Sequence, residues 1–225
     1  MKTALLVVLA FSALAILPVA HSAESARNPP PPAQQKKESM SDANGWFERG
    51  RLHYRAREYD LAVSAFTRAI ELDPGISEAY VNRGLAYGML GKIERAIQDY
   101  DAAIAAGNRS SAVYNNRGLA RYQAGRYAEA IPDYTEAIRR QPNSSTAFYN
   151  RAVALARLKH YDRAISDFDR ALVMDPNNAA GYNGRASANY QLGNYSLAAE
   201  DFEQACSRGI QDSCRLAEEL KKRAK

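Results

Sequence analysis

Residues Ser111–Ser144 read SAVYNNRGLARYQAGRYAEAIPDYTEAIRRQPNS, and this stretch decides the fold of the chain. Its small and apolar residues recur with helical spacing over about Ala112–Ala124 and again from about Tyr127. Gly125 follows the first segment and Pro142 follows the second, and both residue types are typical of helix ends. The stretch therefore predicts two short amphipathic helices joined by a tight turn.

The same pattern recurs every 34 residues, in columns that keep strict register over five units. Small residues fill three columns: Gly50, Gly84, Gly118, Ala152 and Ala186; Ala62, Ala96, Ala130, Ala164 and Ala198; and Ala69, Ala103, Ala137, Ala171 and Ala205. Aromatic residues fill two more: Trp46, Tyr80, Tyr114, Phe148 and Tyr182; and Phe66, Tyr100, Tyr134, Phe168 and Phe202. Small residues let two helices approach closely, and the aromatic residues fill the space around each contact.

At these columns the chain resembles the tetratricopeptide repeat family, whose 34-residue unit carries this aromatic–Gly–Ala–aromatic–Ala–Pro spacing. The resemblance covers residues 43–212 in five units, 43–76, 77–110, 111–144, 145–178 and 179–212. It implies an all-α fold, a right-handed α-solenoid of five helix–turn–helix repeats plus a C-terminal capping helix. It also implies a concave face, lined by the first helix of each pair, that holds peptide segments of partner proteins. The chain departs from the family at Asn108 and Ile210, where the closing proline is missing, and in having Arg before the glycine column.

The two ends of the chain lie outside the repeats. Residues 1–22 have the charged start, apolar run and small residues of a secretory signal peptide, with cleavage expected after Ser22. Residues 23–42 contain Pro29–Pro32 and few apolar side chains, which indicates a disordered spacer. Residues 213–225 are too short for another pair and should form the capping helix. We therefore expect a periplasmic or secreted protein, in contact with a membrane only if the apolar segment is retained as an anchor, which is the alternative.

The candidate binding residues lie on the expected inner face. Asn82, Asn116 and Asn150 are spaced by 34 residues, and stacked amides of this kind can pair with a peptide backbone without reading its side chains. The other members of this polar and aromatic face are Asn115, Asn183, Tyr54, Tyr122, Tyr149 and Tyr190. Replacing all three by Ala should weaken binding and leave the thermal midpoint nearly unchanged, because exposed Asn in a helix adds little stability. The alternative is that these Asn side chains bond a neighbouring helix.

Two charged columns accompany the repeat. Arg occupies one column throughout, at Arg49, Arg83, Arg117, Arg151 and Arg185, and Asp occupies another in four repeats, at Asp99, Asp133, Asp167 and Asp201. Matched columns of opposite charge predict ion pairs between packed helices, in preference to a role in ligand binding.

Cys206 and Cys214 are the only cysteines. Paired cysteines persist as disulfides in the oxidising compartment that an export signal implies. Gly209 lies between them, so the chain can reverse and bring the two side chains together. The family resemblance points the same way, because some exported helical repeats staple paired helices with cysteines at such spacing. Two buried thiols remain the alternative.

Catalysis and cofactor binding find no support in the sequence. The net charge of +5 is a mild excess without a dense basic face, so nucleic acid is not an expected partner. His53 and His160 stand in different repeats without metal-ligand spacing, and no phosphate-binding glycine loop occurs. We expect a non-catalytic scaffold, with no cofactor and no metal, that binds a protein or peptide. The alternatives are a membrane-tethered assembly factor and an accessory subunit of an envelope enzyme complex.

Overall fold

The computed structural model describes residues 42–223, and all regular structure within them is helical. The expectations for a signal peptide and for nearly all of the spacer fall on residues outside this range. The helices are α2 (Ala43–Arg55), α3 (Tyr59–Leu72), α4 (Ser77–Met89), α5 (Ile93–Ala105), α6 (Ser111–Gln123), α7 (Tyr127–Arg140), α8 (Ser145–Arg157), α9 (Tyr161–Met174), α10 (Ala179–Gln191), α11 (Tyr195–Ser207) and α12 (Gln211–Arg223).

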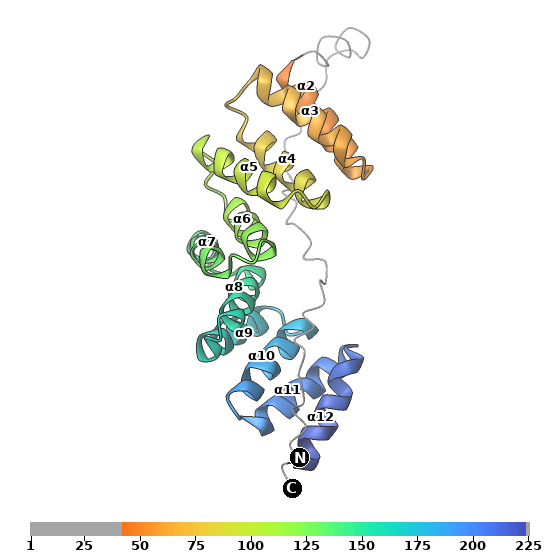
Figure 1. Cartoon of the computed structure of the whole chain (residues 1–225), viewed down its shortest axis with the longest axis vertical. Coiled ribbons are helices and arrows are strands. Elements are labelled where there is room, and N and C mark those ends of the chain that lie inside the picture. The colour runs from red at the N-terminus through yellow and green to blue at the C-terminus, as the bar shows by residue number, and fades with distance from the viewer. Residues whose placement is uncertain (1–41, 224–225) are drawn as a thin grey trace.

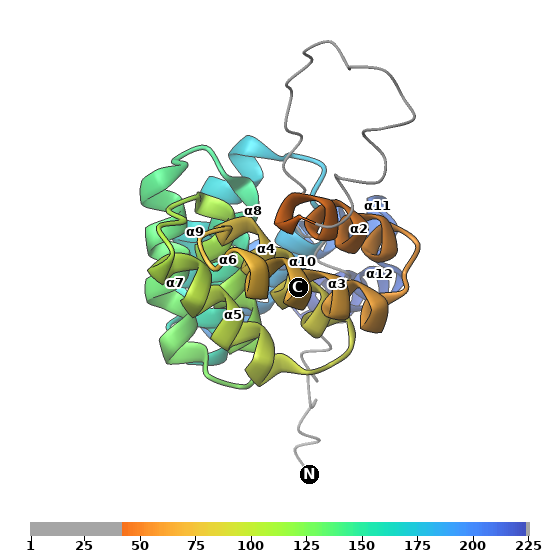
Figure 2. The same ribbon diagram turned by 90° about the horizontal axis from the view of Figure 1, so that it is seen from above.

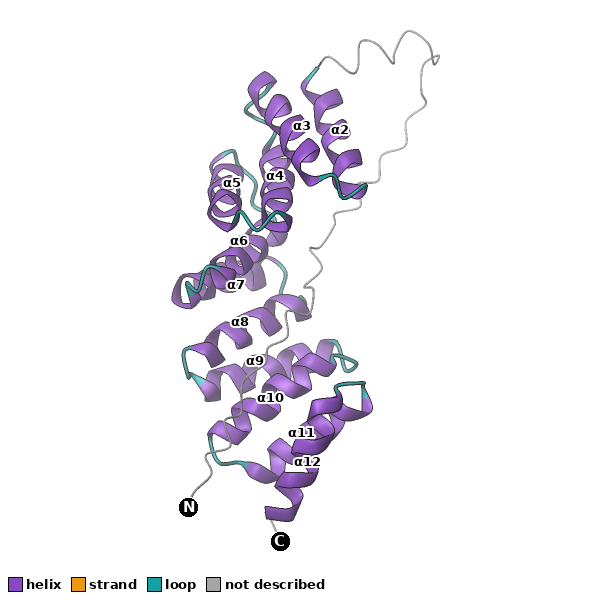
Figure 3. Cartoon of the chain, turned by 45° about the vertical axis from the view of Figure 1, so that its right-hand side comes forward, coloured by secondary structure: helices purple, strands orange, loops and turns teal. Residues whose placement is uncertain are grey.

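The first ten helices form five pairs, one for each 34-residue unit, and the pairs stack along one axis (Figure 1). The second helix of each pair packs on the first helix of the next, as α3 does on α4 and α5 on α6. Short loops join the helices (Figure 3). Figure 2, which looks along the stack, places α5, α7 and α9 on the outer side of α4, α6 and α8. The predicted all-α solenoid of helix pairs is confirmed.

Side chains at repeated positions start the first helices. Asp42, Ser110, Ser144 and Asn178 each accept a hydrogen bond from the backbone N–H three residues further on. These contacts satisfy N–H groups that have no partner within the helix. Four of the five first helices therefore begin directly after a short polar residue whose side chain caps them.

The turn inside each pair needs a left-handed residue. Gly91, Gly125 and Gly193 have φ of 70°, 77° and 80° there. Arg57 and Lys159 occupy the same place in the first and fourth repeats, with φ of 62° and 63°. Only glycine adopts this conformation without a steric penalty, so two of the five turns carry backbone strain.

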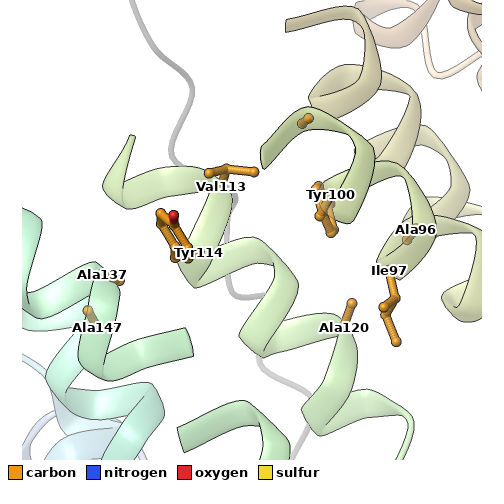
Figure 4. Packing of buried hydrophobic residues seen from close by; sticks show 9 residues of the cluster. Ala96, Ile97, Tyr100, Val113, Tyr114, Ala120, Ala137 and Ala147 are labelled. Carbon is orange, nitrogen blue, oxygen red and sulfur yellow. The ribbon is translucent and has the colours of Figure 1, made fainter. Parts of the chain in front are cut away.

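The core lies in the seams between helices (Figure 4). Ile97 and Tyr100 of α5 pack with Val113 and Ala120 of α6 in one buried cluster. Within a pair, the approach is so close that a Cβ on Gly118 would lie 2.8 Å from the Tyr134 ring. The small-residue column is therefore required by the aromatic column that faces it.

The helix α12 covers the last pair. Its Ala217 and Leu220 pack with Ala198 and Phe202 of α11, and its Ser213 Oγ donates to Asn183 Oδ1 at 3.0 Å. The helix begins at Gln211, two residues before the expected start. Cys206 at the end of α11 and Cys214 in the first turn of α12 are paired as a disulfide, with their Cα atoms 4.9 Å apart.

Candidate functional site

All nine predicted binding residues lie on the first helices of the pairs. Tyr54 is on α2 and Asn82 on α4. The other seven are divided among α6, α8 and α10: Asn115, Asn116, Tyr122, Tyr149, Asn150, Asn183 and Tyr190. In Figure 2, α4, α6 and α8 lie nearer the axis of the stack than α5, α7 and α9, so the surface of the first helices is the inner face of the solenoid.

The expectation of an exposed Asn ladder is wrong. Asn116 and Asn150 are only 4% and 2% exposed, and Asn82, which is half-buried, donates to the Glu78 carbonyl of its own helix at 2.7 Å. The sequence places these residues on one helix face, but it does not show how far neighbouring helices cover that face. The side-chain amide oxygen of Asn183 also has a partner within the protein, because it accepts a hydrogen bond from Ser213 of α12.

A pair of amides joins α6 to α8 instead. Asn150 Nδ2 donates to Asn115 Oδ1 at 3.0 Å, and Asn115 is itself only 7% exposed. Asn150 Oδ1 is buried and has no hydrogen-bond partner among the described residues. An unpaired buried acceptor is uncommon in folded proteins and calls for a partner.

Aromatic side chains gather beside this amide pair. Tyr122 and Tyr149 pack in the cluster around Phe168, and the Tyr122 hydroxyl accepts from Arg157 Nε at 2.9 Å. Burial, with a smaller contribution from Tyr122, raises the pKa of Tyr149 to about 12, so its phenol stays neutral at physiological pH. Tyr54 and Tyr190 lie apart from this group, on α2 and α10. The structure therefore concentrates the predicted site on α6 and α8.

The Arg and Asp columns form the predicted ion pairs. The shortest contacts within a repeat are Arg83–Asp99 at 2.8 Å, Arg117–Asp133 at 2.5 Å, Arg151–Asp167 at 2.7 Å and Arg185–Asp201 at 2.7 Å. The same guanidinium groups also reach the preceding repeat, where their partners are Thr67, Asp101, Thr135 and Asp169. Each of these Arg side chains thus links three helices, its own, the second helix of its pair and the last helix of the preceding pair. We call this arrangement the Arg–Asp bracket, and it supports a structural role over ligand binding.

The first repeat lacks this bracket. Ala65 stands where the other repeats have Asp, and Arg49 instead lies over the Trp46 ring with 4.7 Å between the guanidinium carbon and the ring centroid. The Arg column therefore has a second function, stacking on the preceding aromatic column, which also occurs at Arg83, Arg117, Arg151 and Arg185.

Sequence reasoning missed a pocket at the edge of the inner face. It has a volume of about 530 Å³ and lies between the starts of α6 and α8 and the end of α7. Its lining consists of Arg109, Ser110, Ser111, Ala112, Asn115, Arg139, Arg140, Gln141, Ser144 and Thr146. Arg109 and Arg139 stand at places that carry other residues in the remaining repeats, and the place of Arg140 carries Arg again only at Arg208, so the columns give no signal for the three together. Their presence at only one junction was the available signal.

Within residues 42–223, no group of three His, Cys, Asp or Glu side chains is placed to hold a metal ion. None of the helices in that range combines the length and apolar character that crossing a membrane requires.

Comparisons with known proteins agree with the geometry. One family model described as tetratricopeptide repeat matches residues 47–111 and 115–179, and a second with the same description matches residues 151–223. The chain belongs to the tetratricopeptide repeat family. Members of this family bind protein or peptide partners and are generally non-catalytic. No match was found among curated proteins.

Three solved structures show the same fold at low sequence identity. The structure titled "YrrB: a TPR protein with an unusual peptide-binding site" has a TM-score of 0.71 at 22% identity, over 83% of this tetratricopeptide repeat protein and 95% of that chain. PilF of Pseudomonas aeruginosa has a TM-score of 0.71 at 22% identity, over 84% of this chain and 86% of the PilF chain. MamA of Desulfovibrio magneticus has a TM-score of 0.71 at 17% identity, over 74% of this chain and 94% of the MamA chain.

Proposed function

We propose that this protein is a non-catalytic scaffold that holds a peptide segment of a partner protein against the inner face formed by α6 and α8. The observation that carries this proposal is the buried, unpaired Oδ1 of Asn150 beside the Asn115 amide. Leaving such an acceptor unpaired costs about 1–3 kcal/mol, and a backbone N–H of a bound peptide would remove that cost. A change in the Asn150 side-chain torsion on binding would present the oxygen to the peptide.

The surroundings of the amide pair fit an extended peptide. Tyr122 and Tyr149 supply large apolar surfaces with neutral hydroxyl groups, which are typical of peptide-binding faces. The described residues offer no set of metal-binding side chains, and His53 and His160 lie on or next to different helix pairs. The YrrB structure, whose title names a peptide-binding site, is similar in fold.

Site-specific photocrosslinking tests the proposal. A photoreactive phenylalanine analogue is placed at Tyr149 on the inner face and, as a matched control, at Val173 on the outer helix α9, where the side chain is exposed. After irradiation in the native host, we expect a crosslinked partner from position 149 and none from position 173. Equal products at both positions, or a product at 173 alone, would place the partner elsewhere.

We also propose that the chain is exported and acts in the periplasm or outside the cell. The support is the signal-like composition of residues 1–22 and the cysteine pair, which an oxidising compartment would keep bonded. Mass spectrometry of the protein from its native host should show a chain that begins after Ser22. An intact N-terminus in the membrane fraction would favour the membrane-tethered assembly factor. Copurification with an enzyme would favour the accessory subunit.

A further inference from the structure

The pocket between the starts of α6 and α8 is unusually basic. Arg109 precedes α6, and Arg139 and Arg140 end α7, so three guanidinium groups from two segments line one cavity of about 530 Å³. The N-terminal ends of α6 and α8 add the partial positive charge of their free N–H groups. Hydroxyl groups of Ser144 and Thr146 complete a lining that is suited to anions, whereas the Ser111 hydroxyl already donates to the Ala137 carbonyl at 2.9 Å.

Part of this charge is neutralised within the protein. Arg139 donates two hydrogen bonds to Glu136, and Arg140 donates one to the same carboxylate. The hydrogen bond from Arg139, with that from Arg140, lowers the pKa of Glu136 to about 2, so this carboxylate is ionised at neutral pH. Three guanidinium groups against one carboxylate leave two positive charges in the pocket.

Donors remain available in the pocket. Arg109 donates from Nη1 to the Ile104 carbonyl at 2.8 Å, and its Nε and Nη2 have no partner among the described residues. Asn115 lines the pocket although more than nine-tenths of it is buried. Its Oδ1 accepts from Asn150, but its Nδ2 has no partner in residues 42–223. The amide nitrogen of this mostly buried Asn and a partly used guanidinium thus both remain as donors for a ligand in the pocket.

Arg140 differs from Arg109 and Arg139, because a similar Arg has the same structural role at another junction between repeats. Arg140 lies over the Tyr114 ring at 4.8 Å and donates to the backbone carbonyl of Arg109. Arg208 does the same two repeats further on, over Tyr182 at 4.5 Å and to the Pro176 carbonyl. Arg140 therefore holds a turn in place, whereas Arg109 and Arg139 are additions at this junction.

We propose that this pocket binds acidic side chains of the partner peptide, two carboxylates close together in its sequence. The inference rests on the proposed function, since Asn115 joins the pocket to the amide pair of the inner face. Two uncompensated charges match two carboxylates, and the cavity is larger than one terminal carboxylate requires. Guanidinium–carboxylate hydrogen bonds are among the strongest polar contacts in proteins.

Fluorescence anisotropy with short labelled peptides tests this proposal on the purified chain. The probe has two adjacent glutamates flanked by alanines and is amidated at its C-terminus. The comparison peptides are its glutamine analogue and an all-alanine peptide with a free C-terminal carboxylate. Inorganic phosphate serves as a competitor. We expect the glutamate peptide to bind at least about tenfold more tightly than either comparison peptide, and millimolar phosphate to compete weakly.

Matched double variants locate the binding. Arg109→Gln/Arg139→Gln should weaken binding of the glutamate peptide by about tenfold or more. The control Arg55→Gln/Arg68→Gln removes the same charge from exposed positions in the first repeat, where Arg68 also pairs with a glutamate three residues away. It should change the dissociation constant less than about twofold, because exposed distant charges are screened. Circular dichroism verifies that the double variants fold. The single variant Arg109→Gln, which changes an exposed position, gives a second measure of the loss of peptide binding.

Several results would overturn the proposal. These are equal binding of the glutamine peptide, equal loss in both double variants, binding of the free-carboxylate peptide as tight as that of the glutamate peptide, or displacement by phosphate at the peptide's own concentration. The crosslinking at Tyr149 is a separate measurement. Its failure beside a positive peptide result would refute the inner-face scaffold and leave an acidic-peptide pocket, and the reverse pattern would refute the pocket alone.

Discussion

The hydrogen bond from Asn150 to Asn115 ties α6 to α8 at the level of single side chains. Asn115→Ala removes the only partner that the buried Asn150 amide has within residues 42–223, so we expect it to lower the free energy of unfolding by about 1–3 kcal/mol. Asn82→Ala is the control, because within the described part of the chain Asn82 bonds only its own helix, so its replacement should change that value little.

A double-mutant cycle in urea completes this test. The variant Asn115→Ala/Asn150→Ala should lose less stability than the sum of the single variants, because it leaves no amide buried without a partner. Additive losses would show that the two side chains are not coupled. The burial of Asn116 and Asn150 also revises the expectation for the three stacked Asn residues. Their joint replacement by Ala should lower the thermal midpoint.

The left-handed turn residues give a prediction with the opposite sign. Lys159 has φ of 63° where other repeats have glycine, so Lys159→Gly should raise the free energy of unfolding by up to about 1 kcal/mol. Gly125→Ala should lower it by a similar amount, since the added Cβ would meet no atom within 4 Å and the cost is conformational alone. Urea titrations of both variants measure the two changes. A stabilised Gly125→Ala would contradict the argument.

Residues of the repeat columns were predictable because each one does the same task in four or five repeats. The contact between Gly118 and Tyr134 and the pairing of Arg117 with Asp133 follow from spacing alone. Burial of Asn116 and Asn150 does not follow from it, because it depends on how closely neighbouring repeats pack. Arg109 and Arg139 line a pocket, but the other repeats have other residue types at these two positions. The repeat therefore contains no Arg column that would have predicted the pocket.

At the scale of elements, the disulfide joins α12 to the last helix pair. Cys206→Ser/Cys214→Ser opens a short loop and should lower the free energy of unfolding by about 2–3 kcal/mol. Among the described helices, α12 contacts only the last pair, so it should become the first site of limited proteolysis.

Reduction supplies the control for this prediction. Dithiothreitol should have the same effect on the native chain and none on the double variant. Thiol titration of unreduced protein from its native host should find no free thiol. Two free thiols would show that the bridge is not formed in the cell, and would also weaken the proposal that the chain is exported.

Elements were the part of the structure best predicted from sequence. The helix pair predicted from the central stretch is α6 and α7, with ends within one or two residues of the expected ones. The cap helix was expected from Ser213, but it begins at Gln211 because the Cys206–Cys214 turn is shorter than the other connections between pairs. Helix ends depend on such local contacts, which column spacing does not contain.

At the scale of the molecule, the described solenoid has unequal ends. The helix α12 covers the last pair, whereas α2 has no helix packed on its outer side within residues 42–223. Leu52 shows the difference, because it is 62% exposed while Ala86, Ala120, Ala154 and Ala188 at the same place in later repeats are buried. The first repeat also lacks the Arg–Asp bracket, since Ala65 replaces the Asp.

Hydrogen exchange should follow this asymmetry. Stability in a solenoid is approximately a sum over pairs and their nearest-neighbour interfaces, so a pair with one interface and no bracket opens most often. We expect amides of α2 and α3 to exchange fastest and those of α6 to α8 slowest, with α10 and α11 between them. Ala65→Asp gives Arg49 the partner that its counterparts have, and should slow exchange in α2 and α3 while leaving α10 unchanged. Uniform exchange across all pairs would instead mean that the chain unfolds as one cooperative unit.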